Sequence, residues 1–159
     1  MPRKSKPQPT SSLYPSLHDD VSRLLDETGL EFTFYDVDDG NCERQYDTNI
    51  MGRFVCHNSK CAATGWSSKR IAVTIRKYSG GRYNARVYHQ RCDGCNWLSR
   101  PILDSSYAER VAYRLKKWYG VAVEPPPFER KDNQLPHHKD LCEGCKAGHC
   151  ASSKSYDTI

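Results

Sequence analysis

Seven of the eight cysteines fall into three closely spaced groups whose chemistry is that of metal ligands. The groups are Cys56-x4-Cys61, Cys92-x2-Cys95 and Cys142-x2-Cys145-x4-Cys150. Two thiolates on one tight turn reach the same small cation, and four such ligands close a tetrahedral zinc site with Zn–S distances of about 2.3 Å. One CxxC pair also occurs in redox enzymes, whereas several groups in one chain are typical of zinc. The sequence therefore predicts a fold organised by zinc, with two ions.

Two tetrahedral sites account for the ligands most economically. The first would comprise Cys56, Cys61, Cys92 and Cys95, as in a zinc ribbon, where two loops hold one ion. The second would comprise Cys142, Cys145 and Cys150, with either His137 or His138. A crossed arrangement, in which Cys142 and Cys145 share an ion with another pair, stays open because the number of ligands does not fix their pairing.

The remaining cysteine and four histidines are not needed as ligands. Cys42 lies apart from the close-spaced groups and is predicted to be a plain thiol. His57 and His149 adjoin ligands, but adjacent residues rarely reach the same ion, so we expect them outside the ligand set. We expect His89 to be a core histidine and His18 to be a helix residue without partners.

The composition indicates a small apolar core in an intracellular protein. Of 159 residues, 37% are hydrophobic, and the mean hydropathy is −0.80. Cores of this kind need disulfides or metal for stability. The N-terminal residues lack the apolar stretch of a secretory signal, and no segment approaches the ~18 apolar residues of a membrane span. We therefore expect a cytoplasmic or nuclear location, where thiols stay reduced and available for zinc.

The elements that position the cysteines suggest an α+β fold: a small zinc-ribbon-like antiparallel sheet, a packed helix and a metal-held C-terminal segment. Four parts are expected: a disordered basic tail (1–12), an acidic helix and strand (13–48), a zinc-binding domain (49–150) and a disordered tail (151–159). The predicted elements are a helix over 14–28, strands over 31–37, 52–56, 69–77 and 82–91, a helix from a capping box at Ser106 and Glu109 to Gly120, and an extended linker over 124–128.

The hairpin around Ser79-Gly80-Gly81 allows its register to be argued. A two-residue loop would mix apolar and charged residues on both faces of the hairpin. A three-residue loop instead places Ile71, Val73 and Ile75 on one face with Ala85, Val87 and His89. We therefore predict the three-residue loop, which separates core from surface.

The opposite hairpin face would be basic and aromatic. It gathers Arg76, Tyr78, Arg82, Arg86 and Tyr88, and the following helix carries a row of Arg110, Arg114 and Lys117. Such surfaces bind single-stranded nucleic acid by phosphate pairing and base stacking. The alternative is that the tyrosines pack against a helix and the arginines pair with the acidic segment. Charge is consistent with both, because residues 49–123 carry fourteen lysines and arginines against three acids, and residues 13–48 carry ten acids against two arginines.

The pattern does not favour an enzyme or a small-molecule substrate. A catalytic zinc keeps one coordination position open, whereas thiolate-rich sites of four ligands are closed. Asp93 and Glu143, the acids nearest the ligands, sit inside CxxC turns. The sequence contains no HExxH, GxSxG or glycine-rich phosphate loop.

The order of these motifs resembles the 3CxxC-type zinc-binding family over residues 50–150. The matching stretches are Gly52-Arg-Phe-Val-Cys56 with Gly65-Trp66, Arg86-Val-Tyr-His-Gln-Arg-Cys92-Asp-Gly-Cys95, and Pro136-His-His-Lys-Asp-Leu-Cys142-Glu-Gly-Cys145-Lys-Ala-Gly-His-Cys150. The first pair departs from the pattern, because it is spaced CxxxxC. The resemblance implies His138 as the histidine ligand, with His137 beside it as the alternative.

The family resemblance implies a binding role. Its receptor-transporting members carry a membrane anchor and act on receptors, whereas its zygote arrest members bind RNA; the layout here looks most like the short fungal members. The leading hypothesis is an RNA-binding module that uses the hairpin face and the helix row. The alternative is a protein-binding adaptor or trafficking chaperone without an anchor, and a third hypothesis is zinc buffering or sensing.

Overall fold

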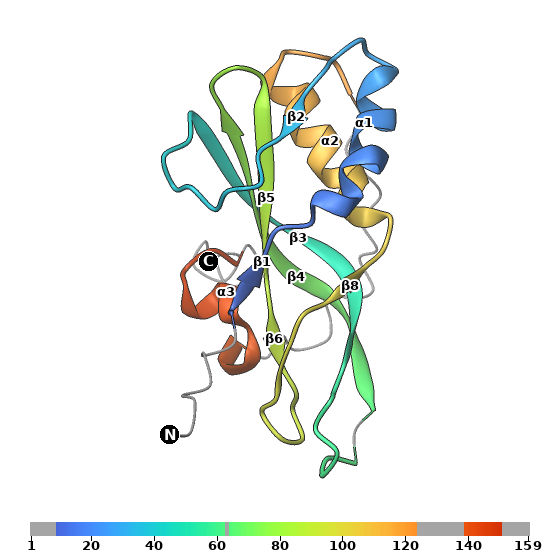
Figure 1. Ribbon diagram of the computed structural model, residues 1–159, viewed down its shortest axis with the longest axis vertical. Coiled ribbons are helices and arrows are strands. Elements are labelled where there is room, and N and C mark those ends of the chain that lie inside the picture. Colours follow the sequence, from blue (N-terminus) through green and yellow to red (C-terminus); the bar gives the residue numbers. More distant parts are fainter. Residues whose placement is uncertain (1–8, 63, 124–138, 151–159) are drawn as a thin grey trace, which may run out of the picture.

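A long twisted sheet runs the length of the molecule, with helices on one face and the C-terminal cysteine segment on the other (Figure 1). The computed structural model describes residues 9–62, 64–123 and 139–150. The elements in chain order are β1 Ser11–Ser12, η1 Pro15–Leu17, α1 His18–Asp26, β2 Thr33–Phe34, β3 Arg44–Val55, β4 Gly65–Tyr78, β5 Arg82–Tyr88, β6 Gln90–Arg91, β7 Leu98–Ser99, β8 Ile102–Leu103, α2 Ser106–Trp118, η3 Lys139–Leu141 and α3 Glu143–Lys146.

The main sheet has the order β1-β5-β4-β3-β8, and every pair along it is antiparallel. The short strand β2 adds to β5 in parallel, while β6 and β7 form a separate two-stranded ribbon. The predicted α+β class is therefore confirmed. The strand predicted over 52–56 is the end of the much longer β3.

The predicted three-residue turn between β4 and β5 is also confirmed. Val73 pairs with Val87, Ile75 with Ala85 and Tyr78 with Arg82, which leaves Ser79, Gly80 and Gly81 as the loop. Gly80 and Gly81 have φ angles of 78° and 69°, a left-handed conformation that glycine adopts without a side-chain clash.

The hydrophobic core lies between α1 and α2 and the face of the main sheet that these two helices cover. The helix stripe Tyr107, Val111 and Leu115 is fully buried, as are Val21 on α1 and Ile75 on β4. Burial of each such side chain contributes about 1.5–3 kcal/mol relative to exposure. The two helices contact each other across this core and fix one face of the sheet.

Several local predictions were wrong. Ser11 and Ser12, expected in a disordered tail, pair with β5. Only Thr33–Phe34 of the expected 31–37 strand pairs in a sheet. Ser106 is the first residue of α2 rather than its cap, because its Oγ accepts the N–H of Met51 at 2.7 Å. Residues 124–128, the expected linker, lie outside the described part of the chain.

Candidate metal centres

The first cysteine cluster joins the ends of two hairpins. Cys56 and Cys61 lie in the connection after β3, and Cys92 and Cys95 lie in the turn between β6 and β7. The four sulfur atoms all lie within 4.8 Å of one another. The Sγ atoms of Cys56 and Cys95 are 3.5 Å apart, and those of Cys61 and Cys92 are 3.9 Å apart. A tetrahedron with Zn–S bonds of about 2.3 Å has edges of about 3.8 Å, so this cluster fits zinc.

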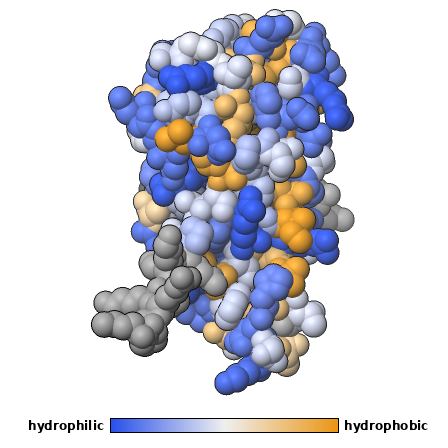
Figure 2. Space-filling view, viewed as in Figure 1, coloured by the Kyte–Doolittle hydropathy of each residue, from blue (hydrophilic) through white to orange (hydrophobic). Residues whose placement is uncertain are grey.

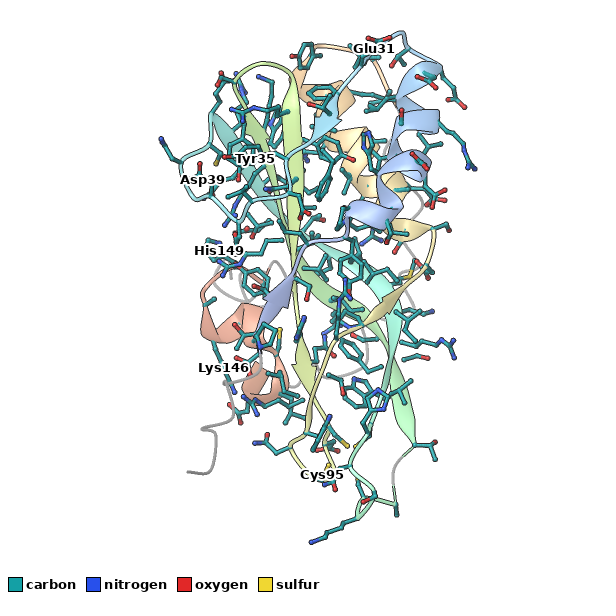
Figure 3. The ribbon with its side chains drawn as sticks, viewed as in Figure 1. Glu31, Tyr35, Asp39, Cys95, Lys146 and His149 are labelled. Carbon is teal, nitrogen blue, oxygen red and sulfur yellow. The ribbon has the colours of Figure 1, made fainter. Side chains whose placement is uncertain are left out.

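Backbone hydrogen bonds hold both turns of this cluster. The N–H of Cys61 donates to the carbonyl of Asn58 at 3.0 Å, and the N–H of Cys92 donates to Trp97 at 2.8 Å. Asn96 adopts a positive φ of 64° and donates to the Cys92 carbonyl at 2.7 Å. Figure 3 shows Cys95 near one end of the molecule, far from Glu31 at the opposite end. The site therefore clamps the two hairpin arms where no helix supports them.

The thiols of this cluster cannot all ionise without a cation between them. A side-chain hydrogen bond from Asn58 lowers the pKa of Cys95 to about 7. The Asn58 backbone N–H also favours the Cys56 thiolate, but burial and hydrogen bonds with the other three thiols together raise the pKa of Cys56 to about 12. A bound metal reverses this competition by stabilising every thiolate at once.

The second cluster lies on the sheet face that the helices leave open. Cys142, Cys145 and Cys150 bring their sulfur atoms within 4.8 Å of one another. Cys142 is the N-cap of α3, and its Sγ accepts the N–H of Cys145 at 3.3 Å. The Nδ2 of Asn49 reaches the Sγ of Cys150 at 3.6 Å. The pKa of Cys142 is raised, chiefly by its hydrogen bond with Cys150 and next by burial. A cation is therefore needed for the thiols of this buried cluster to ionise together.

The described residues supply three ligands to the second site. His137 and His138, the two predicted fourth ligands, lie outside the described part of the chain. The Nδ1 of His149 lies 3.2 Å from Oδ2 of Asp47, and the His149 ring stacks on the Tyr88 ring with 6.0 Å between the ring centroids. Figure 3 shows His149 and Lys146 on the α3 side of the sheet. His149 thus anchors the segment beside the ligands, as expected for a residue outside the ligand set.

Gln90 connects the two clusters. It forms a backbone bridge with Cys142 and lies two residues before Cys92. Its side-chain amide donates to Ser68 Oγ and to the Arg70 carbonyl, both at 3.2 Å, and its Oε1 accepts from Trp66 Nε1 at 3.3 Å. One buried glutamine therefore ties both metal segments to β4.

A second connection is ionic. Arg91 Nε donates to Glu143 Oε1 at 2.7 Å, and Lys146 Nζ lies 3.3 Å from the same oxygen. Burial alone would raise the pKa of Glu143, but the hydrogen bonds and positive charges of Arg91 and Lys146 outweigh burial. The pKa of Glu143 is therefore lowered from its usual value. Glu143, predicted to serve a turn, thus also holds α3 against β6.

The structure separates the cysteines into two clusters rather than one crossed arrangement. All eight cysteines are described and none forms a disulfide. Cys42 lies outside both clusters, 3.9 Å from Gln45 Oε1. His89 is buried with its Nε2 2.7 Å from Ser12 Oγ, as expected of a core histidine. His18 was expected to lack partners, and this was wrong, because its Nδ1 lies 2.7 Å from the Tyr83 hydroxyl.

The predicted basic face of the hairpin is not an open surface. Arg76, Tyr78 and Tyr88 are all buried. Asp38 bridges Arg76 Nη1 at 2.6 Å and Arg86 Nε at 3.2 Å. Burial lowers the pKa of Arg76, but the hydrogen bond to Asp38 outweighs it and raises the pKa above its usual value.

Two segments cover this face, neither of which is one of the expected helices. Tyr78 donates to the carbonyl of Asp39, and its ring packs against that of Tyr35 in a tilted arrangement with 4.8 Å between the ring centroids. The guanidinium of Arg82 lies 4.4 Å from the ring centre of Tyr35. Tyr88 packs under the second cysteine cluster. The expectation of an exposed face was therefore wrong, because residues 35–43 and α3 occupy it.

The helix row is divided between core and surface. Arg110 is buried, Arg114 is half-buried and Lys117 is exposed. Arg114 lies over the ring of Tyr46 with 3.4 Å between the guanidinium carbon and the ring centre. Tyr46 belongs to β3, so this contact joins the helix row to the open edge of the sheet.

Around this contact lies a basic, aromatic region that the sequence did not reveal. We call it the β3–α2 surface; it comprises Arg44, Tyr46, Lys77, Tyr113, Arg114, Lys117 and Tyr119. Tyr46 and Tyr119 are 43% and 48% exposed. Lys117 Nζ lies 3.3 Å from the Tyr113 hydroxyl, and Lys77 Nζ lies 5.4 Å from the Tyr119 ring centre. The signal that could have found it is a β3 strand extended back to Arg44, opposite Lys77.

Comparison with known proteins finds a relative for part of the chain. The chain is 28% identical over 123 residues to human receptor-transporting protein 4, an alignment that covers 67% of this chain and 49% of that protein. The chain thus spans about half the length of this relative. No helix in the described residues is long and apolar enough to span a membrane. No solved structure matches the chain.

A family model described as a zinc-binding domain, of the 3CxxC zinc-ribbon type, matches residues 49–148. This range contains both cysteine clusters except Cys150. The predicted zinc cofactor is confirmed, and the chain belongs to the 3CxxC zinc-ribbon family of zinc-binding domains.

Proposed function

We propose that this protein is a non-catalytic intracellular module whose zinc ions hold its shape and whose β3–α2 surface binds single-stranded RNA. The observation that carries the proposal is the coupling of exposed tyrosines to arginine and lysine side chains on one surface. Cations pair with phosphates, and aromatic rings stack on bases at about 1–3 kcal/mol per base.

The charge balance of this surface supports an anionic ligand. Arg44 and Lys117 are exposed and Arg114 is half-buried, whereas Lys77 is paired with Glu43 at 2.6 Å. Of the residues predicted to bind RNA, Arg114 and Lys117 belong to this surface. Arg82 and Arg86 are half-buried and engaged with Ser79, Asp38 and Tyr35. Binding is therefore proposed for the helix side of the sheet rather than for the hairpin face.

A non-catalytic role is supported by the donor chemistry of the clusters. Four thiolates close the first site, which leaves no coordination position for a substrate. When bound, zinc supplies the folding energy that this small core lacks. The ligands are held by hydrogen bonds within their turns, by the backbone bridge between Gln90 and Cys142, and by the buried Asn49 amide at Cys150.

The test is fluorescence polarisation of zinc-loaded full-length protein with a labelled mixed single-stranded RNA pool across a salt series. We expect binding that weakens steeply with salt, because released counterions contribute about −0.7 per neutralised phosphate to the logarithmic slope. Tyr46→Ala should cost about 1–3 kcal/mol by loss of stacking. Lys117→Glu should weaken binding and flatten the salt slope.

Two matched variants locate the surface. Arg53→Glu reverses another exposed charge of β3, nine residues from Arg44 and so about 30 Å along the strand, and should change affinity little. Arg82→Glu reverses a charge on the covered hairpin face and should also change it little. Absence of binding at low salt by protein with two bound zinc ions would refute RNA binding, and loss on Arg82→Glu but not on Lys117→Glu would refute this surface.

A protein-binding adaptor is the second candidate function. The relative is named for receptor transport, and that name concerns the relative rather than this chain. Trp66 is a large aromatic residue near the first cysteine cluster, but it is half-buried and its ring stacks on Phe54 with 4.8 Å between the ring centroids. Its loss would disturb the fold, so an adaptor has to be tested at another surface.

A further inference from the structure

An open groove of about 470 Å³ lies between α1 and the beginning of α2. Its apolar lining includes Leu17 and Leu24 from the first helical region, Leu103 from β8 and Ala108 from α2. The three leucines pack against the core but keep part of their surface exposed. Figure 2 shows a hydrophobic patch at the level of β8, on the right of this view, within a mainly hydrophilic face.

The rim of this groove is acidic although the chain is basic overall. Asp20, Asp104 and Glu109 line it, and Arg23 is the basic residue that lines it with them. Arg23 is 78% exposed in its side chain and lies 3.7 Å from Asp20. Arg110 is a further cation near Asp104 and Glu109, but it is buried. The net charge of +5 for the whole chain therefore does not extend to this rim.

Local structure explains only part of this acidity. Asp104 Oδ1 accepts the N–H of Ser106 at 2.8 Å and so stabilises the start of α2. Asp20 and Glu109 lie in the first turns of α1 and α2, where acids complement the helix dipole. Both side chains belong to exposed residues, so their charge stays available to a ligand.

We propose that this groove docks a basic amphipathic segment of a partner protein. One large apolar side chain of that segment enters between Leu24 and Leu103, while lysine or arginine side chains pair with Asp20 and Glu109. Apolar anchors supply affinity, and complementary charge supplies orientation and association rate. The same acids repel phosphates, so this groove and the β3–α2 surface at the other end of α2 take different ligands.

The test uses a phage-displayed library of random 12-residue peptides, selected on zinc-loaded full-length protein. Enriched sequences are synthesised with a fluorescent label, and their affinities are measured by fluorescence polarisation. We expect enriched peptides to combine a leucine-like anchor with lysine or arginine three or four residues away, as on one face of a helix.

Substitutions in and around the groove test whether these peptides bind there. Asp20→Lys and Glu109→Lys reverse the rim charges, and Ser105→Trp fills the groove at a position whose side chain makes no capping bond. Each should weaken binding at least tenfold. Asp26→Lys is the control, because it reverses an exposed acid of the same helix that does not line this groove. Ser105→Ala shows whether loss of the hydroxyl alone has an effect.

The possible results separate cleanly. Basic amphipathic peptides that lose affinity in the rim and groove variants but not in Asp26→Lys support the proposal. Failure to enrich any sequence, enrichment of acidic peptides, or peptides unaffected by Ser105→Trp overturn it. Concentration-dependent self-association that Ser105→Trp abolishes would assign the groove to a second copy of this chain, and would likewise overturn it. Lys117→Glu should leave peptide binding intact, so failure of RNA binding is distinguishable.

Discussion

The contact between α3 and the sheet allows one substitution to be predicted in detail. Gly144 faces Ala72 so closely that a Cβ at residue 144 would lie well inside van der Waals distance of the Ala72 Cβ, and 3.4 Å from Cβ and Cγ of Tyr88. Carbon atoms normally approach to about 3.5–4.0 Å. In Gly144→Ala, α3 must therefore move away from β4 by more than ~1 Å.

That movement acts on atoms which have little freedom to adjust. The Cβ of Ala72 is fixed to the backbone of a central strand, and the bridge between Gln90 and Cys142 holds α3 in place. Overpacking of this kind costs about 1–3 kcal/mol. We expect the free energy of unfolding, measured by urea titration of zinc-loaded protein, to fall by that amount. Zinc should also leave the second site faster when a chelator is added.

Two further variants test the steric reason. Gly40→Ala is the control, because nothing lies within 4 Å of an added Cβ there and its φ is not positive; its stability should stay within about 0.5 kcal/mol of the parent. Ala72→Gly should cost about 0.5–1 kcal/mol alone but offset most of the loss when combined with Gly144→Ala. Equal stability of Gly144→Ala and Gly40→Ala, or no such coupling, would refute the reasoning.

Three other outcomes are expected. Zinc measured by elemental analysis should fall from two ions per chain to one in Cys150→Ala, with the first site retained; loss of both would contradict separate sites. Asp38→Asn should lower the free energy of unfolding by about 1–3 kcal/mol, because charge-assisted bonds to Arg76 are lost, whereas the exposed neighbour variant Asp36→Asn should not. Burial, with the charge of Arg100, lowers the pKa of His89 from 6.5 to about 4, so the folded state resists protonation that the unfolded state accepts. The contribution of neutral His89 to the free energy of unfolding is therefore complete above pH 6.5 and is lost as the pH falls toward 4. The difference in free energy of unfolding between the parent and His89→Gln should shrink over this pH range.

The parts of the fold that were predictable depend on local spacing. The cysteine groups and the register of the Ser79–Gly81 hairpin follow from residues close together in the chain, and the structure agrees on both. The core positions of α2 also follow a local spacing, because Tyr107, Val111 and Leu115 recur every four residues and all three are buried.

The parts that were missed depend on contacts between distant segments. Nothing near Arg76 or Tyr78 in the sequence shows that Asp38 and Asp39 cover them, although the acidic charge of that region made pairing one of the alternatives. The capping box failed because Ser106 bonds to Met51, which lies 55 residues away. Tyr46 was not recognised because β3 begins eight residues before the predicted strand and carries polar residues at its start.

The position of the second cysteine cluster also has a consequence for the order in which the protein is made. Residues 142–150 leave the ribosome after every strand that they cover, including β4 with Ala72 and β5 with Tyr88. Folding during synthesis proceeds from the N-terminal side, so the first zinc ion can be captured while this face of the sheet is still bare. A chain interrupted before Cys142 would keep Tyr88 uncovered and Arg91 without Glu143. Capture of the second zinc ion thus requires that translation has passed Cys150, and a chain that stops earlier leaves the sheet face at Ala72 and Tyr88 uncovered.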